Sequence, residues 1–270
     1  MMLALMLPLL MLAPDPLPPG MPERQSKYVP DRPLAIPAGP LPMNAAQCTA
    51  LAKADPVKAE AAGKAWRDSG GGLPARACIG MAQFGQEHFQ DAATTFELAA
   101  RDAQIADDRE AAVLWMQAGN AALAADEAVR ARTAFDRVLL LPGLSDEMKG
   151  EVYLDRARAN VAANDTVSAK ADLDQTTRLV PRDPLGWLLT ANLARKRKDM
   201  PTAFAAIREA ARLAPGDAAI AYEAGNIAAA SGQMDDAKAA WTRAAQADPK
   251  SDAGQAAALA LAGEGGTGKP

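Results

Sequence analysis

Residues 218–249 read AAIAYEAGNIAAASGQMDDAKAAWTRAAQADP, and this stretch predicts two helices joined by a turn. In its first half, small residues recur at i, i+3, i+4 and i+7, which is one face of a helix: Ala221, Ala224, Gly225 and Ala228. Gly232 interrupts the pattern, and a second face follows with Ala237, Trp241 and Ala244. Pro249 ends the second helix, because proline cannot continue one. We expect Trp241 to fill the space above the small face. A lone pair of this size cannot bury that face, so it needs neighbours.

The neighbours are found upstream in the same register. The sequence predicts five units, which span residues 73–106, 112–145, 150–183, 184–217 and 218–249. The last three follow one another at a period of 34 residues. Insertions of five and four residues precede the second and the third unit. Small, large and proline residues recur at matching places, as in Trp187, Ala191, Ala203, Ile207 and Pro215 of the fourth unit.

These recurring places resemble those of the tetratricopeptide repeat (TPR), a 34-residue helical hairpin. The first unit departs from the pattern, with Arg76 where the repeat usually has Trp and Gln104 in place of Pro. The resemblance implies an all-α fold: a right-handed superhelical solenoid of about five hairpins with capping helices at its ends. It covers residues 73–249.

The composition and the flanking segments agree with such a solenoid. Aromatic residues make up only 4% of the chain, and closely packed helical pairs favour small side chains. We expect residues 44–72 to form a leading helical pair and residues 250–262 a closing helix, because the end units of a solenoid need covers. Residues 263–270 are expected to be a flexible tail.

Two segments at the N-terminus bear on localisation. Residues 1–13, MMLALMLPLLMLA, are too short to span a bilayer and look like the apolar part of a secretory signal. Residues 14–43 contain ten of the chain's twenty prolines and predict an extended linker. We therefore expect an exported, periplasmic protein. A retained apolar tail, with membrane contact only through that tail, and a cytoplasmic location are the alternatives.

Cys48 and Cys78 are the only cysteines. An even number of cysteines after an export signal favours a disulfide, and two small buried thiols are the alternative. Two cysteines and a single histidine, His88, do not suffice for a structural zinc site, so we expect no metal and no cofactor. The net charge of −4 and the lack of a basic stripe argue against nucleic-acid binding. We also find no catalytic constellation and expect no enzyme.

The resemblance also implies a working surface. In TPR proteins the first helices line a concave groove that binds an extended peptide. The matching places here are Met116, Asn120, Leu154, Arg158, Leu188, Asn192, Arg195, Lys196, Tyr222 and Asn226. The asparagines at the ninth place of a unit could bond to a peptide backbone, or they could bond to the adjacent unit instead. Arg158, Arg195 and Lys196 would favour an acidic or C-terminal ligand.

We therefore expect a scaffold that binds a peptide or a partner protein. A self-assembling architectural protein, or an accessory subunit of an enzyme complex, is the alternative.

Overall fold

The structure is a computed structural model that describes residues 43–266, so the predicted leader and almost all of the proline-rich linker lie outside the described residues. Within residues 43–266 it contains thirteen α-helices and no strand. The leading and closing helices are α1 (Ala45–Ala54), α2 (Pro56–Asp68) and α13 (Asp252–Gly266). Between them lie five pairs: α3 (Gly72–Gly85) and α4 (Phe89–Ile105), α5 (Glu110–Ala124) and α6 (Ala128–Leu139), α7 (Asp146–Ala162) and α8 (Thr166–Leu179), α9 (Pro184–Lys196) and α10 (Met200–Leu213), α11 (Ala218–Ala230) and α12 (Met234–Ala247). The all-α solenoid expected from the sequence is confirmed.

The turn inside each pair has the same geometry in all five pairs. A backbone N–H three residues after the first helix donates to a carbonyl five residues earlier, as from Gln233 to Ala228 at 2.9 Å. The residue before that donor has a positive φ, a conformation that glycine adopts most easily. It is a glycine only in the last pair (Gly232); the others are Glu87, Asp126, Asn164 and Lys198. Equal turns make the five hairpins alike.

The two helices of a pair are locked together by residues sixteen apart in the sequence. Where the second helix carries an aromatic residue, the first carries glycine: Gly80 faces Phe96, Gly119 faces Phe135, and Gly225 faces Trp241. A Cβ atom built on Gly225 would lie only 2.4 Å from the indole of Trp241. Where the large residue is aliphatic, as in Leu173 and Ile207, the facing residue is alanine: Ala157 and Ala191. The space between the two helices of a pair is therefore filled by these two positions together: the larger the residue on the second helix, the smaller the residue that faces it on the first.

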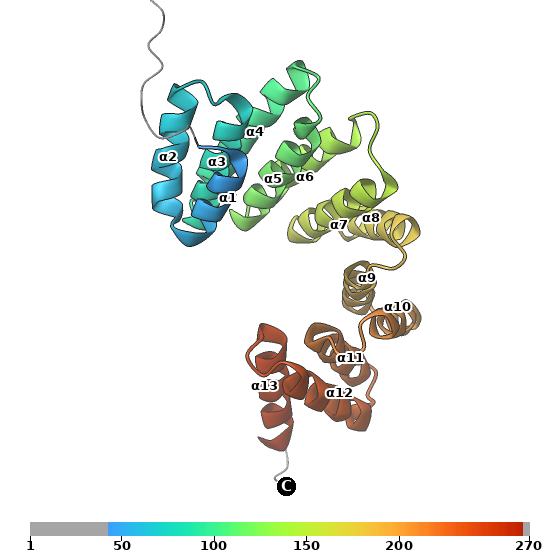
Figure 1. The fold of residues 1–270 in the computed structure, drawn as a ribbon. Coiled ribbons are helices and arrows are strands. Elements are labelled where there is room, and N and C mark those ends of the chain that lie inside the picture. The colour runs from blue at the N-terminus through green and yellow to red at the C-terminus, as the bar shows by residue number, and fades with distance from the viewer. Residues whose placement is uncertain (1–42, 267–270) are drawn as a thin grey trace, which may run out of the picture. The chain divides into compact units, whose positions relative to one another are not determined.

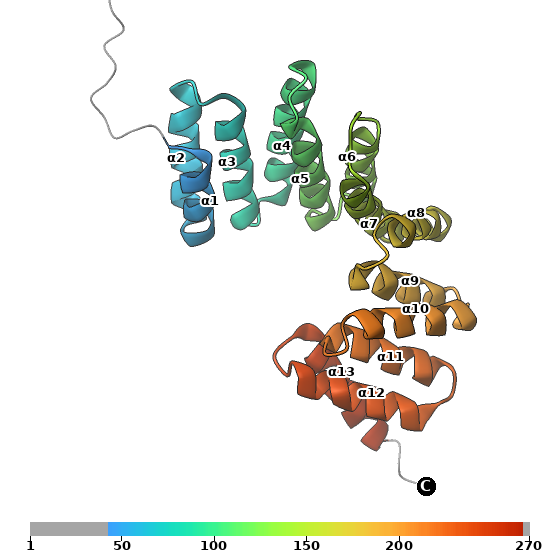
Figure 2. The same cartoon turned by 45° about the vertical axis from the view of Figure 1, so that its right-hand side comes forward.

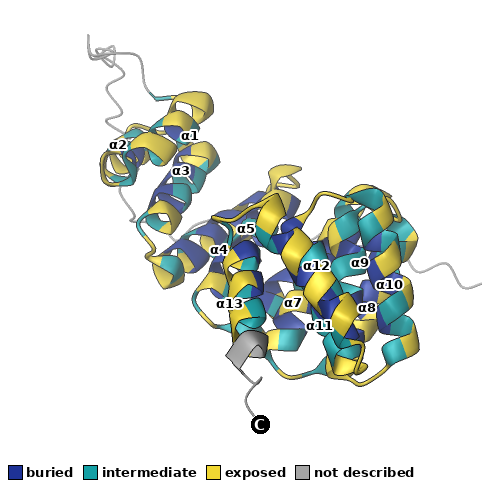
Figure 3. Ribbon diagram, turned by 90° about the horizontal axis from the view of Figure 1, so that it is seen from below, coloured by how far each residue is buried: buried dark blue, intermediate teal, exposed yellow. Residues whose placement is uncertain are grey.

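The pairs stack in chain order, and each helix has a buried and an exposed face (Figure 3). Figures 1 and 2 show that the stack formed by α1–α13 is curved, with the first helices of the pairs on its inner side. The contacts agree, since α5 contacts α7 and α9 contacts α11. The largest apolar cluster extends from Ala92 on α4 to Ala159 on α7.

The third pair contains a polar cluster in its interior. Asp172, whose side chain is 5% exposed, pairs with Arg156 at 2.5 Å, and Asn160 donates to the same carboxylate at 2.8 Å. Asp136 on α6 also pairs with Arg156, at 2.6 Å. Burial opposes the charge on Arg156, but the hydrogen bonds to these two carboxylates outweigh it and raise the pKa of the guanidinium above its usual value. The cluster joins α6, α7 and α8.

Both ends of the stack are covered. A disulfide links Cys48 on α1 to Cys78 on α3, with 5.7 Å between their Cα atoms and both side chains fully buried. At the other end α13 packs on α11 and α12. This helix continues to Gly266, four residues beyond its expected end at Ala262, so part of the predicted tail is helical. Glycine lowers helix propensity but does not by itself end a helix.

Candidate functional site

The ten residues predicted to line a groove all lie on the first helices α5, α7, α9 and α11, which form the inner side of the stack (Figure 1). They differ in exposure. Leu154 is buried in the cluster around Leu173, whereas Met116, Leu188 and Tyr222 are half-buried. Leu154 therefore belongs to the core, and the apolar residues among the ten predicted positions do not form a continuous half-exposed row.

The asparagines at the ninth place bond within the chain. Asn120 on α5 donates to Asp155 on α7 at 3.1 Å, and Asn192 on α9 donates to Glu223 on α11 at 3.2 Å. Both acceptors stand at the sixth place of the following unit. The two pairs are 35 and 31 residues apart, and the four-residue insertion accounts for the difference. Their amide N–H groups therefore hold adjacent units together, which is the second of the two roles considered for them.

Two other predicted polar residues are also engaged. Glu223, whose side chain is 6% exposed, pairs with Arg195 at 2.7 Å and accepts from Asn226 at 3.3 Å. Asn226 in turn accepts from the indole N–H of Trp241 at 3.1 Å. Arg195 thus has a carboxylate partner on the next unit, and the expectation that it recruits an acidic ligand loses its basis.

The remaining polar candidates lie at the surface. Arg158 is exposed and pairs with Asp155 of its own helix at 3.0 Å. Lys196 is exposed at the end of α9. A surface ion pair of this kind contributes little to stability, so Arg158 can leave Asp155 to contact a ligand; Lys196 has no ion-pair partner among residues 43–266 and can do the same.

The hydrogen bond from the ninth place of one unit to the sixth place of the next does not form between the third and fourth pairs, where these residues are Arg158 and Leu189, nor between the first two pairs. There the ninth place of the first unit is Met81, and the sixth place of the second unit is Gln117. Methionine cannot donate a hydrogen bond to the amide oxygen. A cavity of about 220 Å³ opens at this position, and we call it the α3–α5 cavity. Its lining residues are Met81, Phe84, Phe96, Gln117 and Asn120.

The α3–α5 cavity combines apolar walls with one unsatisfied polar atom. Gln117 Oε1 is buried and has no hydrogen-bond partner among residues 43–266. Leaving a buried acceptor unpaired costs about 1–3 kcal/mol. Phe84, one of the lining residues, is 39% exposed and packs edge-on against Phe89, with ring centroids 5.1 Å apart. These walls suit one apolar side chain, and the Gln117 side chain would have to turn before its closed-off Oε1 could accept from an N–H group in the cavity.

Sequence reasoning did not identify Phe84, Phe96 or Gln117 as site residues. A signal was present, since Met81 stands where three of the other four units carry asparagine. This signal points to the cavity only once it is known that the ninth place of one unit contacts the sixth place of the next.

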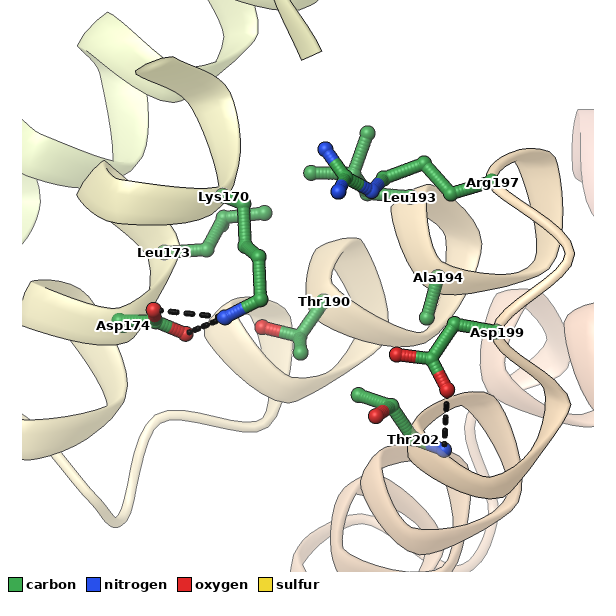
Figure 4. Close-up of a pocket in the computed structure, with 9 residues that line it drawn as sticks. All are labelled: Lys170, Leu173, Asp174, Thr190, Leu193, Ala194, Arg197, Asp199 and Thr202. Carbon is green, nitrogen blue, oxygen red and sulfur yellow. Dashed lines mark hydrogen bonds and ion pairs between the residues drawn. The ribbon is translucent and has the colours of Figure 1, made fainter. Parts of the chain in front are cut away.

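A second cavity, between α8, α9 and α10, does not suit a ligand. Figure 4 shows its lining, in which Lys170 pairs with Asp174 and Asp199 accepts from the backbone N–H of Thr202. Its volume of about 30 Å³ is that of a water molecule or two. Residues 43–266 also gather no group of three His, Cys, Asp or Glu that could hold a metal ion, and none of their helices is long and apolar enough to cross a membrane.

No protein-family model and no curated protein sequence matches this chain. Solved structures do resemble it. A chain of the APC/C hetero-tetramer Cut9–Hcn1 matches with a TM-score of 0.61 and 16% identity over 83% of this chain; the match spans only 43% of that chain. YrrB, described as a TPR protein with an unusual peptide-binding site, matches with a TM-score of 0.51 and 16% identity over 73% of this chain and 96% of its own.

The thermophilic TPR protein TTC0263 from Thermus thermophilus matches with a TM-score of 0.56 and 18% identity, over 70% of this chain and 98% of its own. At these identities the likeness concerns the fold. Residues 43–266 have the tetratricopeptide-repeat fold, as the sequence pattern predicts.

Proposed function

We propose that this protein is a non-enzymatic scaffold that binds an extended segment of another protein on the inner side of its solenoid. The α3–α5 cavity is the observation that carries the proposal. Its apolar walls match one side chain of an extended peptide, and a turn of the Gln117 side chain would offer its unpaired acceptor to one N–H group of that peptide. YrrB, which shares the fold, is described as having a peptide-binding site, and this supports the proposal by analogy.

The rest of the binding surface would follow the inner side from the cavity toward the C-terminus. Met116, Leu188 and Tyr222 are half-buried there and offer apolar contacts to alternate side chains of a peptide. The amide N–H groups of Asn120 and Asn192 are bonded to carboxylates of the chain, so backbone recognition falls to Gln117. Arg158 and Lys196 would add charge contacts that weaken with salt.

Peptide selection with a matched set of variants tests this proposal. Dodecapeptides selected from a random phage library on the full chain would be synthesised and measured by fluorescence anisotropy. Gln117→Leu removes the unpaired acceptor, so it should raise the free energy of unfolding by about 1 kcal/mol and yet weaken peptide binding at least fivefold. Phe84→Ala should weaken binding similarly. Val57→Ala, at a 65% exposed position on α2, is the control and should change neither.

Failure of the selection, or equal binding by all variants, would refute a peptide site at this cavity. Sedimentation of the unliganded protein separates the main alternative, since self-assembly requires concentration-dependent oligomers and a peptide-binding scaffold does not.

We also propose that the protein works in an exported, oxidising compartment. The apolar segment 1–13 and the Cys48–Cys78 disulfide support this location. Cell fractionation should recover the protein in the periplasm in oxidised form. Cytoplasmic recovery with both thiols reduced would refute it.

A further inference from the structure

The two insertions that break the 34-residue period come together in space. Because residue 104 is not proline, α4 continues to Ile105 and reaches 17 residues. The second insertion lengthens the turn before α7 and the first turn of α7, which also has 17 residues. Both insertions follow a second helix, and such turns share one edge of the stack (Figure 2).

The inserted residues enclose a cleft of about 750 Å³, which we call the edge cleft. Its floor is apolar: Ala111 and Ala112 are buried, and Leu141, Leu144 and Met148 are half-buried against the core. Leu140 lies at its border and is 79% exposed. A leucine this exposed beside an apolar floor leaves apolar surface that a partner can cover.

The two segments that carry the edge cleft are acidic, and Asp107 and Asp108 line the cleft itself together with Arg109. Residues 105–110 and 140–149 contain five acidic side chains against two basic ones: Asp107, Asp108, Glu110, Asp146 and Glu147 against Arg109 and Lys149. Asp107 and Asp108 have no salt-bridge partner among residues 43–266, and the nearest basic group to Asp146 is Lys149 at 3.9 Å. Part of this charge serves the helices, because Asp108 accepts from the backbone N–H of Glu110 at the start of α5. Helix capping does not need so many carboxylates.

We propose that the edge cleft is a second interaction surface, which binds a segment of a partner protein that carries an apolar side chain between lysines or arginines. The apolar side chain would cover Leu140 and the floor between α5 and α7. The flanking basic side chains would pair with the carboxylates of Asp107 and Glu147. This surface lies at the edge of the stack and is independent of the α3–α5 cavity.

Two labelled heptapeptides of matched shape, KKLWLKK and EELWLEE, test the proposal by fluorescence anisotropy on the full chain. We expect the lysine peptide to bind at least tenfold more tightly than the glutamate peptide, and the ratio to fall between 50 and 300 mM salt. Leu140→Ser should weaken binding of the lysine peptide at least fivefold, and Asp107→Asn with Glu147→Gln should weaken it as well. Val167→Ser, at a 73% exposed position on α8, is the matched control and should have no effect.

Several results would overturn the proposal. Equal binding of the two peptides removes the charge argument, and an unchanged affinity of Leu140→Ser places the peptide elsewhere. Loss of binding in Gln117→Leu would assign the peptide to the α3–α5 cavity. The basic residues Arg24, Lys27 and Arg32 lie in the chain's own N-terminal segment. Tighter peptide binding after their replacement by alanine would identify that segment, and not a partner, as the occupant.

Discussion

Glu223→Ala is the substitution that best tests how the units are held together. Glu223 is 5% exposed and lies where the fourth and fifth units meet. Its carboxylate accepts from Arg195 and Asn192 on α9 and from Asn226 on α11. Truncation removes this acceptor and leaves three donors, two of which belong to the preceding unit.

The expected loss is about 3 kcal/mol in the free energy of unfolding of the C-terminal units. A hydrogen bond between charged groups contributes about 1.5–3 kcal/mol, and the Arg195 side chain, 25% exposed, recovers part of this from water. The two amide donors are also half-buried, and each adds about 0.5 kcal/mol. The sum is at the lower end of the 3–5 kcal/mol typical of a broken buried pair. Glu223→Gln keeps an acceptor oxygen and should lose only about 1–2 kcal/mol.

Hydrogen exchange followed by mass spectrometry is the appropriate assay, because stability in a solenoid is set by neighbouring units. Protection should fall in α11–α13, fall less in α9 and α10, and stay unchanged in α3–α5. The melting temperature should drop by about 6–12 °C, at 2–4 °C per kcal/mol. Glu151→Ala, which removes an exposed carboxylate on α7 that has no ion-pair partner among the described residues, is the control.

Unchanged protection in α11 and α12 after Glu223→Ala would show that the bonds to Arg195 and Asn192 do not couple the units. A loss spread evenly over α3–α13 would instead show that the whole stack unfolds as one, against nearest-neighbour behaviour. Either result would refute the reasoning.

Three further predictions concern the other features of the fold. Gly225→Ala forces a Cβ atom against Trp241 and should lower the free energy of unfolding by about 1–3 kcal/mol, measured by chemical denaturation. Ala191→Gly, where the facing residue is Ile207, should lower it by only about 1 kcal/mol. Equal losses in the two variants would contradict the pairing of a small residue on the first helix with a large one on the second. Replacing Cys48 and Cys78 by alanine releases a constraint on a 30-residue separation and should cost about 3–4 kcal/mol, with the earliest proteolytic cleavage in α1; cleavage that begins elsewhere would contradict it. Hydrogen bonds from Ser168 and Thr202 lower the pKa of Asp165 and Asp199 at the starts of α8 and α10. Near pH 4 the folded chain therefore binds fewer protons than the unfolded chain, and the stability that these groups contribute above that pH should be lost as the pH falls below about 4. Asp199→Asn should flatten the pH dependence of the melting temperature between pH 3 and pH 6, and an unchanged slope would contradict this prediction.

The contacts inside each hairpin could be predicted from the sequence because they join residues sixteen apart. Gly225 and Trp241 are separated by the last part of α11, a three-residue turn and the first half of α12, and all of these have fixed geometry. The local pattern of small residues, large residues and proline stops was therefore enough to predict the hairpins and the solenoid that they form. The burial of Trp241, at 6% exposure, follows from the same pattern.

Contacts between units depend on how one hairpin is rotated on the next, and the period of a repeat does not encode that rotation. Asn120 and Asn192 could face a ligand or the following unit, and only the superhelix brought Asp155 and Glu223 within hydrogen-bond distance of them. The same rotation places Met81 against Gln117, where no amide–carboxylate bond can form and the α3–α5 cavity remains open. The sequence by itself thus determined the hairpin and its repetition, since both rest on short-range packing. The tertiary structure alone decided which polar residues join the units and where the chain keeps open surface, because that choice is made between residues about one repeat apart.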